Sequence, residues 1–121
     1  MWKPKNNILQ EKSFAFAVRV VNVYKYLMKN KEYVMSKQLL RSGTSIGANI
    51  EEALQAQSKK DFIAKLYISL KEAYETDYWI RLLDAAKILT RSQASSIGKD
   101  VHELIRIMTS IIKTTKSNIG K

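Results

Sequence analysis

The chain has 121 residues and a formal net charge of +10, because 21 lysines and arginines outnumber 11 aspartates and glutamates. Its length and its 45 % share of hydrophobic residues suit one domain with a buried core. The absence of cysteine excludes a disulfide scaffold, a cysteine nucleophile and zinc–thiolate or iron–sulfur sites. No uncharged apolar run approaches the ~20 residues that span a bilayer, and residues 1–7 lack the apolar stretch of a secretory signal. We therefore expect a cytoplasmic protein that makes no contact with a membrane.

The first predicted helix covers about residues 8–29 and carries two apolar stripes. One stripe consists of Phe14, Val18, Val21 and Met28, and the other consists of Phe16, Val20, Val23 and Leu27. Two stripes are more than a helix needs when it faces a single core. The extra stripe therefore calls for a second apolar neighbour.

The second predicted helix covers about residues 36–56, with Ser36 as its N-cap. Two glycines, Gly43 and Gly47, lie one turn apart inside it. Each costs about 1 kcal/mol relative to alanine in a helix interior. We expect that a neighbouring helix approaches closely at these two positions.

Two further helices are predicted over about residues 59–89 and 92–116, each with a start signal. Ser58 precedes the first as an N-cap with Asp61 three residues later, and Thr90 with Gln93 forms a candidate capping box for the second. The apolar faces are Phe62, Leu66, Leu70, Ala73 and Ile80 in one helix, and Ile97, Val101, Leu104, Met108, Ile111 and Thr115 in the other.

Four long helices with short connections favour antiparallel neighbours. We therefore predict an all-α fold, an up-down-up-down, left-handed four-helix bundle that forms one domain over residues 1–121.

Enzymatic classes find little support in the residues. The single histidine is His102. A metal-binding bundle uses Glu-x-x-His motifs, but the residue three positions before His102 is Lys99 and not glutamate. Residues 42–47 have the wrong spacing for a phosphate-binding loop and are not followed by its lysine. We place His102 at the surface and predict no catalytic residue, metal site or cofactor.

A set of polar residues shares one face of the second helix. Arg41, Ser45, Asn49 and Glu52 follow one another at steps of four, four and three. On the third helix Glu72 and Glu75 lie in an apolar stripe, where carboxylates need partners, and Arg41 or Asn49 would provide one. The set either fixes helix register and subunit orientation or forms a surface patch for a ligand or partner.

The positive charge gathers at both ends of the predicted bundle. Lysines outnumber arginines there, and lysine contacts phosphate as a point charge without reading base edges. A solvated lysine-rich surface with no ligand is the alternative. The candidate nucleic-acid-binding residues are Lys29, Lys31, Lys37, Lys59, Lys60, Lys87, Arg91, Lys113 and Lys116.

The second helix carries a recognisable run over residues 36–53, SKQLLRSGTSIGANIEEA. Residues 12–17, 58–63 and 68–73 add further matches. Together they resemble the bacterial four-helix bundle family named for 23S rRNA intervening sequences, also called S23 ribosomal proteins. The family's recurrent polar residues fall on Arg41, Ser45, Asn49, Glu52 and Glu72.

The resemblance implies a four-helix protomer of a ring-shaped homopentamer, in which one stripe of the first helix would face the bundle core and the other a neighbouring subunit. One relative is the accessory variability protein of diversity-generating retroelements, which binds nucleic acid and a reverse transcriptase. No catalytic activity is established for the family. We therefore expect a non-enzymatic, oligomeric accessory protein that binds RNA or DNA through lysines. The alternative is a protein-interaction scaffold that recruits a reverse transcriptase or another protein through the polar residues.

Overall fold

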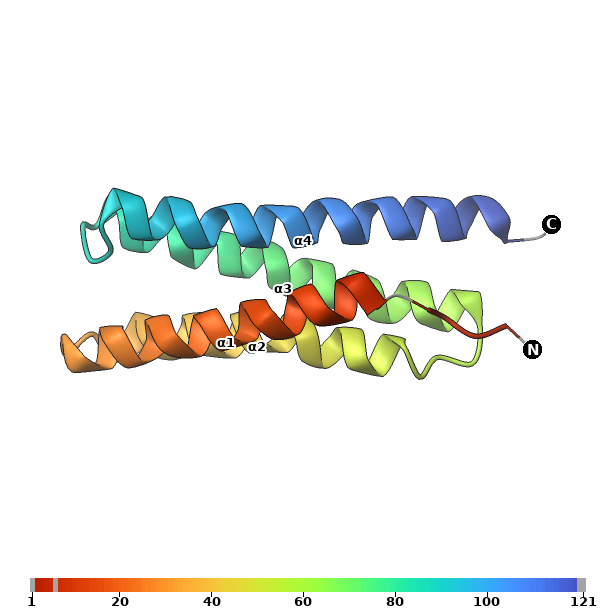
Figure 1. Ribbon diagram of the computed structural model, residues 1–121, viewed down its shortest axis with the longest axis horizontal. Coiled ribbons are helices and arrows are strands. Elements are labelled where there is room, and N and C mark those ends of the chain that lie inside the picture. Colours follow the sequence, from red (N-terminus) through yellow and green to blue (C-terminus); the bar gives the residue numbers. More distant parts are fainter. Residues whose placement is uncertain (1, 6, 120–121) are drawn as a thin grey trace.

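A computed structural model describes residues 2–5 and 7–119. Within them the chain forms four helices and no strand: α1 (Asn7–Lys29), α2 (Val34–Ala53), α3 (Lys59–Ala85) and α4 (Arg91–Asn118). The α1–α2 and α3–α4 connections lie at one end, and the α2–α3 connection lies at the other end with the two termini (Figure 1). The predicted all-α, up-down-up-down bundle is confirmed. No helix in the described ranges has the length and apolarity to cross a membrane.

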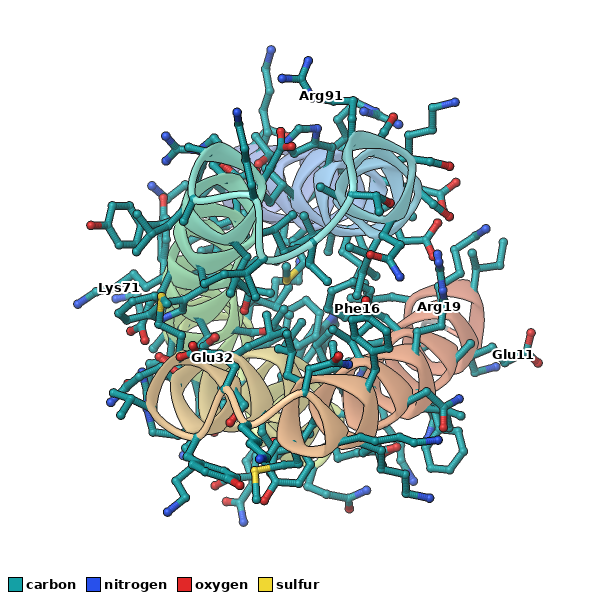
Figure 2. The ribbon with its side chains drawn as sticks, turned by 90° about the vertical axis from the view of Figure 1, so that its left-hand side faces the viewer. Glu11, Phe16, Arg19, Glu32, Lys71 and Arg91 are labelled. Atoms are coloured by element: carbon teal, nitrogen blue, oxygen red, sulfur yellow. The ribbon has the colours of Figure 1, made fainter. Side chains whose placement is uncertain are left out.

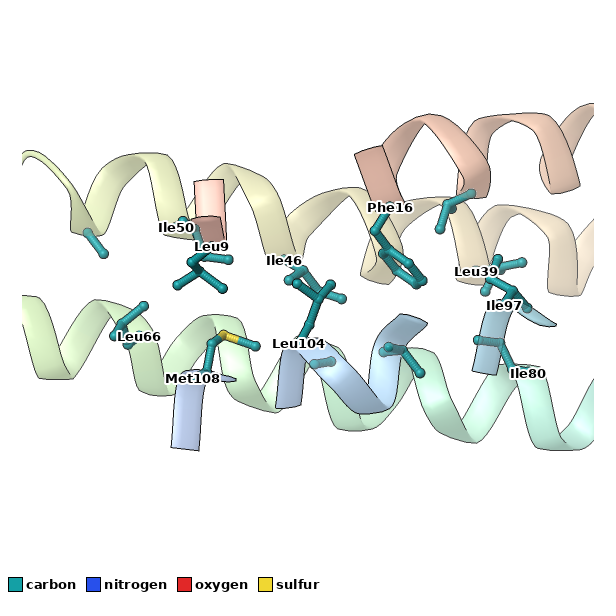
Figure 3. Packing of buried hydrophobic residues seen from close by; sticks show 14 of the residues in the cluster. Leu9, Phe16, Leu39, Ile46, Ile50, Leu66, Ile80, Ile97, Leu104 and Met108 are labelled. Atoms are coloured by element: carbon teal, nitrogen blue, oxygen red, sulfur yellow. The ribbon is translucent and has the colours of Figure 1, made fainter. Parts of the chain in front are cut away.

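The core follows a regular spacing along each helix (Figure 3). On α3 the inward positions alternate in steps of four and three, a pattern that favours left-handed bundle packing. They are Phe62, Leu66, Ser69, Ala73, Thr76, Ile80 and Leu83, and all are buried. Of the two predicted stripes of α1, the one that faces the core contains Phe16, Val20 and Leu27, which are buried in the same cluster, and Val23, which packs against it.

Small hydroxyl side chains lie in the contact between α2 and α3. Ser69 Oγ donates to the carbonyl of Ile46 at 2.8 Å, and Thr76 Oγ1 donates to Ser42 Oγ at 2.9 Å. In the part of the chain that is described, every buried side-chain nitrogen and oxygen has a partner. These hydroxyls let the two helices pack closely without leaving a polar atom unsatisfied.

Both glycines of α2 contact a neighbouring helix as expected, and the structure shows that this helix is α1. A Cβ atom on Gly43 would lie 2.7 Å from a methyl of the buried Val20, well inside van der Waals contact. A Cβ atom on Gly47 would lie 3.5 Å from the carbonyl oxygen of Ser13. The close approach of α1 is therefore the physical reason for a glycine at position 43. At position 47 it leaves ordinary van der Waals contact with the backbone of Ser13.

The helix starts were predicted with mixed success. Ser58 Oγ accepts the Asp61 N–H at 3.1 Å, and Thr90 and Gln93 form the complete capping box, so both predicted caps are confirmed. Ser36 was wrongly predicted as the N-cap of α2, which begins at Val34. Ser36 is buried inside the helix instead.

Two helices end in a left-handed residue that is not glycine. Lys31 follows α1 with φ of 64° and Lys87 follows α3 with φ of 60°. After Lys87 the N–H of Ile88 donates to the carbonyl of Leu83 at 2.9 Å, which closes a Schellman motif. Because a lysine marks this stop, the sequence prediction carried the third helix four residues too far, to residue 89 in place of Ala85.

Candidate nucleic-acid interface

The outer face of α4 carries a line of cations. Lys99, Arg106 and Lys113 recur every seven residues, which places them on one exposed face about 10.5 Å apart. Arg91 near the start of α4 and Lys116 near its end are also exposed and extend the line. We call these five residues the α4 basic ridge. It runs the length of the helix, about 38 Å from Arg91 to Lys116.

The acidic residues of α4 lie off the ridge, on the side of α1. Arg19 of α1 pairs with Asp100 and donates to Ser96 Oγ at 2.9 Å, and Lys12 pairs with Glu103 at 3.2 Å. Figure 2 shows Arg19 reaching from α1 toward α4. Both carboxylates of α4 are thus used to hold α1, and the ridge keeps its positive field.

The nine predicted lysine and arginine candidates divide between the two ends of the bundle. At the end with the α1–α2 and α3–α4 connections lie Lys29, Lys31, Lys37, Lys87 and Arg91, and at the other end lie Lys59, Lys60, Lys113 and Lys116. All are exposed except the half-buried Lys59. The structure does not bring the two groups together, but the ridge connects them.

Some of these candidates already have partners. Arg91 pairs with Asp84 at 3.2 Å, and Lys59 Nζ donates to the carbonyl of Asn118 at 3.2 Å. Lys116 donates to the hydroxyl of Tyr67 at 2.7 Å and lies 5.0 Å from the centre of its ring. Such contacts fix the long side chains and lower the entropy lost when they bind a ligand.

The sequence prediction missed Lys99 and Arg106 because it assigned charge only to the bundle ends. The sequence signal for these two residues is their spacing: Lys99, Arg106 and Lys113 are each seven residues apart, which places all three on one face of a helix.

A second polar site lies on the surface between α2 and α3. Arg41 donates to Glu72 at 3.1 Å and also pairs with Glu75. The indole N–H of Trp79 donates to the same Glu75 carboxylate at 3.0 Å. We call these four residues the Arg41 network.

The contacts in the Arg41 network shift the pKa values of Arg41 and Glu75. The hydrogen bond to Glu75 is the main factor that raises the pKa of Arg41 above its ordinary value. The Trp79 indole, followed by Arg41, lowers the pKa of Glu75, and partial desolvation opposes this. Both side chains are charged at neutral pH, and the two shifts widen the pH range over which the ion pair persists.

His102 lies exposed on α4, as predicted, with Nε2 2.7 Å from Asp77 Oδ1. Among the residues that the structure describes, no three histidine or acidic side chains form a group that could hold a metal ion.

The sequence profile of the 23S rRNA-intervening sequence protein family matches residues 5–110. The chain belongs to this family. A crystal structure of a protein of unknown function from the S23 ribosomal protein family of Bacteroides thetaiotaomicron VPI-5482 is 58 % identical to it. That similarity covers 88 % of this chain and 99 % of the other, with a TM-score of 0.86. Among curated proteins no sequence match was found.

In this member of the family, the five polar residues singled out in the sequence form two groups. Arg41 and Glu72 meet in the Arg41 network, whereas Ser45 and Asn49 bond within their own helix, to the carbonyls of Arg41 and Ser45 at 2.6 and 2.8 Å. Glu52 pairs separately with Lys65 at 3.8 Å. Asn49 is thus no partner of the carboxylates, and Arg41 is.

Replacing Glu75 by glutamine tests the Arg41 network. Because the pKa of Glu75 is lower in the folded protein than in the unfolded chain, its charge stabilises the fold above the unfolded pKa. This contribution is lost as the pH falls through the folded value. We expect Glu75→Gln to lower the free energy of unfolding by less than about 1 kcal/mol at neutral pH, since the pair is partly exposed.

The measurement is urea unfolding from neutral pH down through the acid range, with Glu11→Gln, an exposed single substitution, as the control. The difference between wild type and Glu75→Gln should shrink below about pH 4.5, the ordinary value for this side chain. If the difference in the free energy of unfolding stays constant as the pH falls into the acid range, the charge of Glu75 does not stabilise the fold.

Proposed function

We propose that this protein is a non-enzymatic, oligomeric accessory protein that binds RNA or DNA through the phosphate backbone. The α4 basic ridge carries the proposal, because its five cations share one face while both acidic residues of α4 pair with α1. We place the protein in the cytoplasm, which its cysteine-free composition suits.

The residue types on the ridge favour binding with little sequence preference. Three of its five members are lysines, which neutralise phosphate without the fork that arginine offers to guanine. Each phosphate contact releases counterions, so affinity falls steeply with salt. The ridge is therefore suited to tracking a nucleic-acid backbone.

Two apolar surfaces support self-association. Phe14 and Val18, which belong to the other apolar stripe of α1, have 69 % and 48 % of their surface exposed. On α3 the side chains of Ile68, Tyr74 and Tyr78 are exposed as well. A ring needs two different surfaces that fit each other, and we propose these for a homopentamer. Five copies would carry a charge of about +50, from +10 each, which strengthens attraction to polyanions.

The proposal is tested by electrophoretic mobility shifts with a structured RNA across a salt series. We expect binding in the micromolar range or tighter at low salt, with log K falling linearly against log salt concentration. The same gels with duplex DNA determine which nucleic acid binds more tightly. No shift at the lowest salt would refute the proposal.

The Arg41 network favours a second candidate function, a scaffold that recruits a reverse transcriptase or another protein. It lies at the surface, contains the half-buried Trp79 and is one helical turn from the exposed Ile68, so a partner reaches both charge and apolar area. A pull-down that is lost on Glu72→Ala, in a variant with unchanged fold and native mass, supports the scaffold. If the variant loses its native mass, the Arg41 network serves assembly.

A further inference from the structure

A hollow of about 210 Å³ lies between α3 and α4, beside the basic ridge. Its lining has carboxylates from α3, cations from both helices and one glycine of α4. The lining residues used below are Asp77, Arg81, Asp84, Arg91, Gly98, Lys99 and His102.

The carboxylates lie inside the hollow and the cations stand at its rim. Asp77, with 17 % of its side chain exposed, accepts from Arg81 at 3.1 Å and contacts His102 at 2.7 Å. Asp84, at 26 %, accepts from Arg91 at 3.2 Å. The side chains of Arg81 and Arg91 remain 67 % and 86 % exposed. Each acid thus holds an arginine in place at the rim, and a ligand meets positive charge first.

Lys99 adds an exposed cation to this lining without an ion pair in the described part of the chain. The hollow then has three permanent positive charges against two negative ones, and because Arg81 and Arg91 each pair with one of the acids, Lys99 leaves it with a net charge of +1. An anion is the ligand that this arrangement attracts.

Gly98 keeps the hollow open, and packing does not require it. A Cβ atom built on Gly98 would meet no neighbouring atom within 4 Å, in contrast to Gly43, where α1 leaves no room. A glycine inside a helix is nevertheless unfavourable relative to alanine. Packing therefore does not explain why position 98 lacks a side chain. The missing side chain leaves space between the cations of the rim.

We infer that this hollow binds one phosphate group, held between Arg81, Arg91 and Lys99 above Gly98. Its volume is below the roughly 300–1,000 Å³ of sites for drug-sized ligands, so it suits a single phosphate group and not a whole nucleotide. Arginine forks bind phosphate oxygens in pairs. The phosphate is either free or part of the nucleic acid that follows the ridge; only the second source rests on the proposed function.

Methyl NMR tests the inference, with the side chain of Ile80, which also lines the hollow, as the reporter and buried Ile50 of α2 as the reference. Inorganic phosphate should shift the Ile80 methyl signal in a saturable way and leave Ile50 unchanged. Gly98→Leu, whose side chain enters open space, should weaken this response at least about tenfold. Lys5→Gln, an exposed lysine near the N-terminus at the far end of the bundle, should leave it unchanged.

A second titration with structured RNA separates the sources. If RNA shifts the Ile80 signal and Gly98→Leu removes this shift, the hollow binds a phosphate of the nucleic-acid backbone. A response to phosphate alone assigns it to the free ion, and mobility shifts then judge the proposed function separately. No Ile80 response to phosphate, or a response in correctly folded Gly98→Leu that is as strong as in the wild-type protein, would overturn the inference, whether or not RNA binds.

Discussion

Replacing Gly43 by alanine is expected to destabilise the bundle by about 2 kcal/mol, although alanine is the better helix former. The new methyl would lie 2.7 Å from a methyl of Val20, which is fully buried. Valine has few rotamers in a helix and cannot turn away. The strain therefore falls on the spacing between α1 and α2. Urea unfolding at a fixed protein concentration measures the effect, since assembly also shifts the apparent stability.

Gly98→Ala is the matched control for this prediction. The substitution is the same, and Gly98 also lies inside a helix, but its Cβ meets no neighbour. It should raise the free energy of unfolding by up to about 1 kcal/mol. Combining Gly43→Ala with Val20→Ala should show a favourable interaction energy between the two sites. If the two alanine variants have the same stability, close approach of α1 does not explain Gly43.

The second large effect concerns nucleic acid. Changing Lys99, Arg106 and Lys113 to glutamine removes three cations from one face of α4. If nucleic acid lies along this face, affinity for structured RNA should fall at least about tenfold at moderate salt, because three phosphate contacts are lost. All three side chains are exposed, so the fold and its stability should not change.

A matched variant removes the same charge elsewhere. Lys5, Lys25 and Lys71 are exposed and lie off the ridge, and Figure 2 shows Lys71 pointing away from α4. Their triple change to glutamine alters the net charge equally and tests the general field of the protein. We expect an affinity loss of less than about threefold. Equal losses in the two variants would show that net charge, and no particular face, attracts RNA.

The bundle could be predicted because the helical period and the caps are local signals. Ser58 and Thr90 act on the backbone three residues away, and the apolar stripe with Phe16 and Val20 shows its period directly. Gly43 and Gly47 also signalled close packing, because two glycines one turn apart are unfavourable inside a helix, and the structure places α1 against both. The family run over residues 36–53 added the fold independently.

The remaining features depend on neighbours that are distant in sequence. Ser69 and Thr76 look polar, but their hydroxyls find partners on α2, which makes them core residues. Ser36 looks like a cap and is buried. Arg41 and Asn49 were both candidates to pair with the carboxylates of α3, but in the structure Arg41 pairs with Glu72 while Asn49 donates to a carbonyl of its own helix. The hollow beside Gly98 exists only once α3 and α4 lie together.

The salt dependence of RNA binding tests most directly whether the α4 basic ridge binds the phosphate backbone. The slope of log K against log salt concentration counts the phosphate contacts that a protein makes. Between wild type and the Lys99/Arg106/Lys113 variant, the magnitude of the slope should fall by about 2 to 3, while the Lys5/Lys25/Lys71 variant keeps the wild-type slope. An unchanged slope in the ridge variant would contradict the proposed interface.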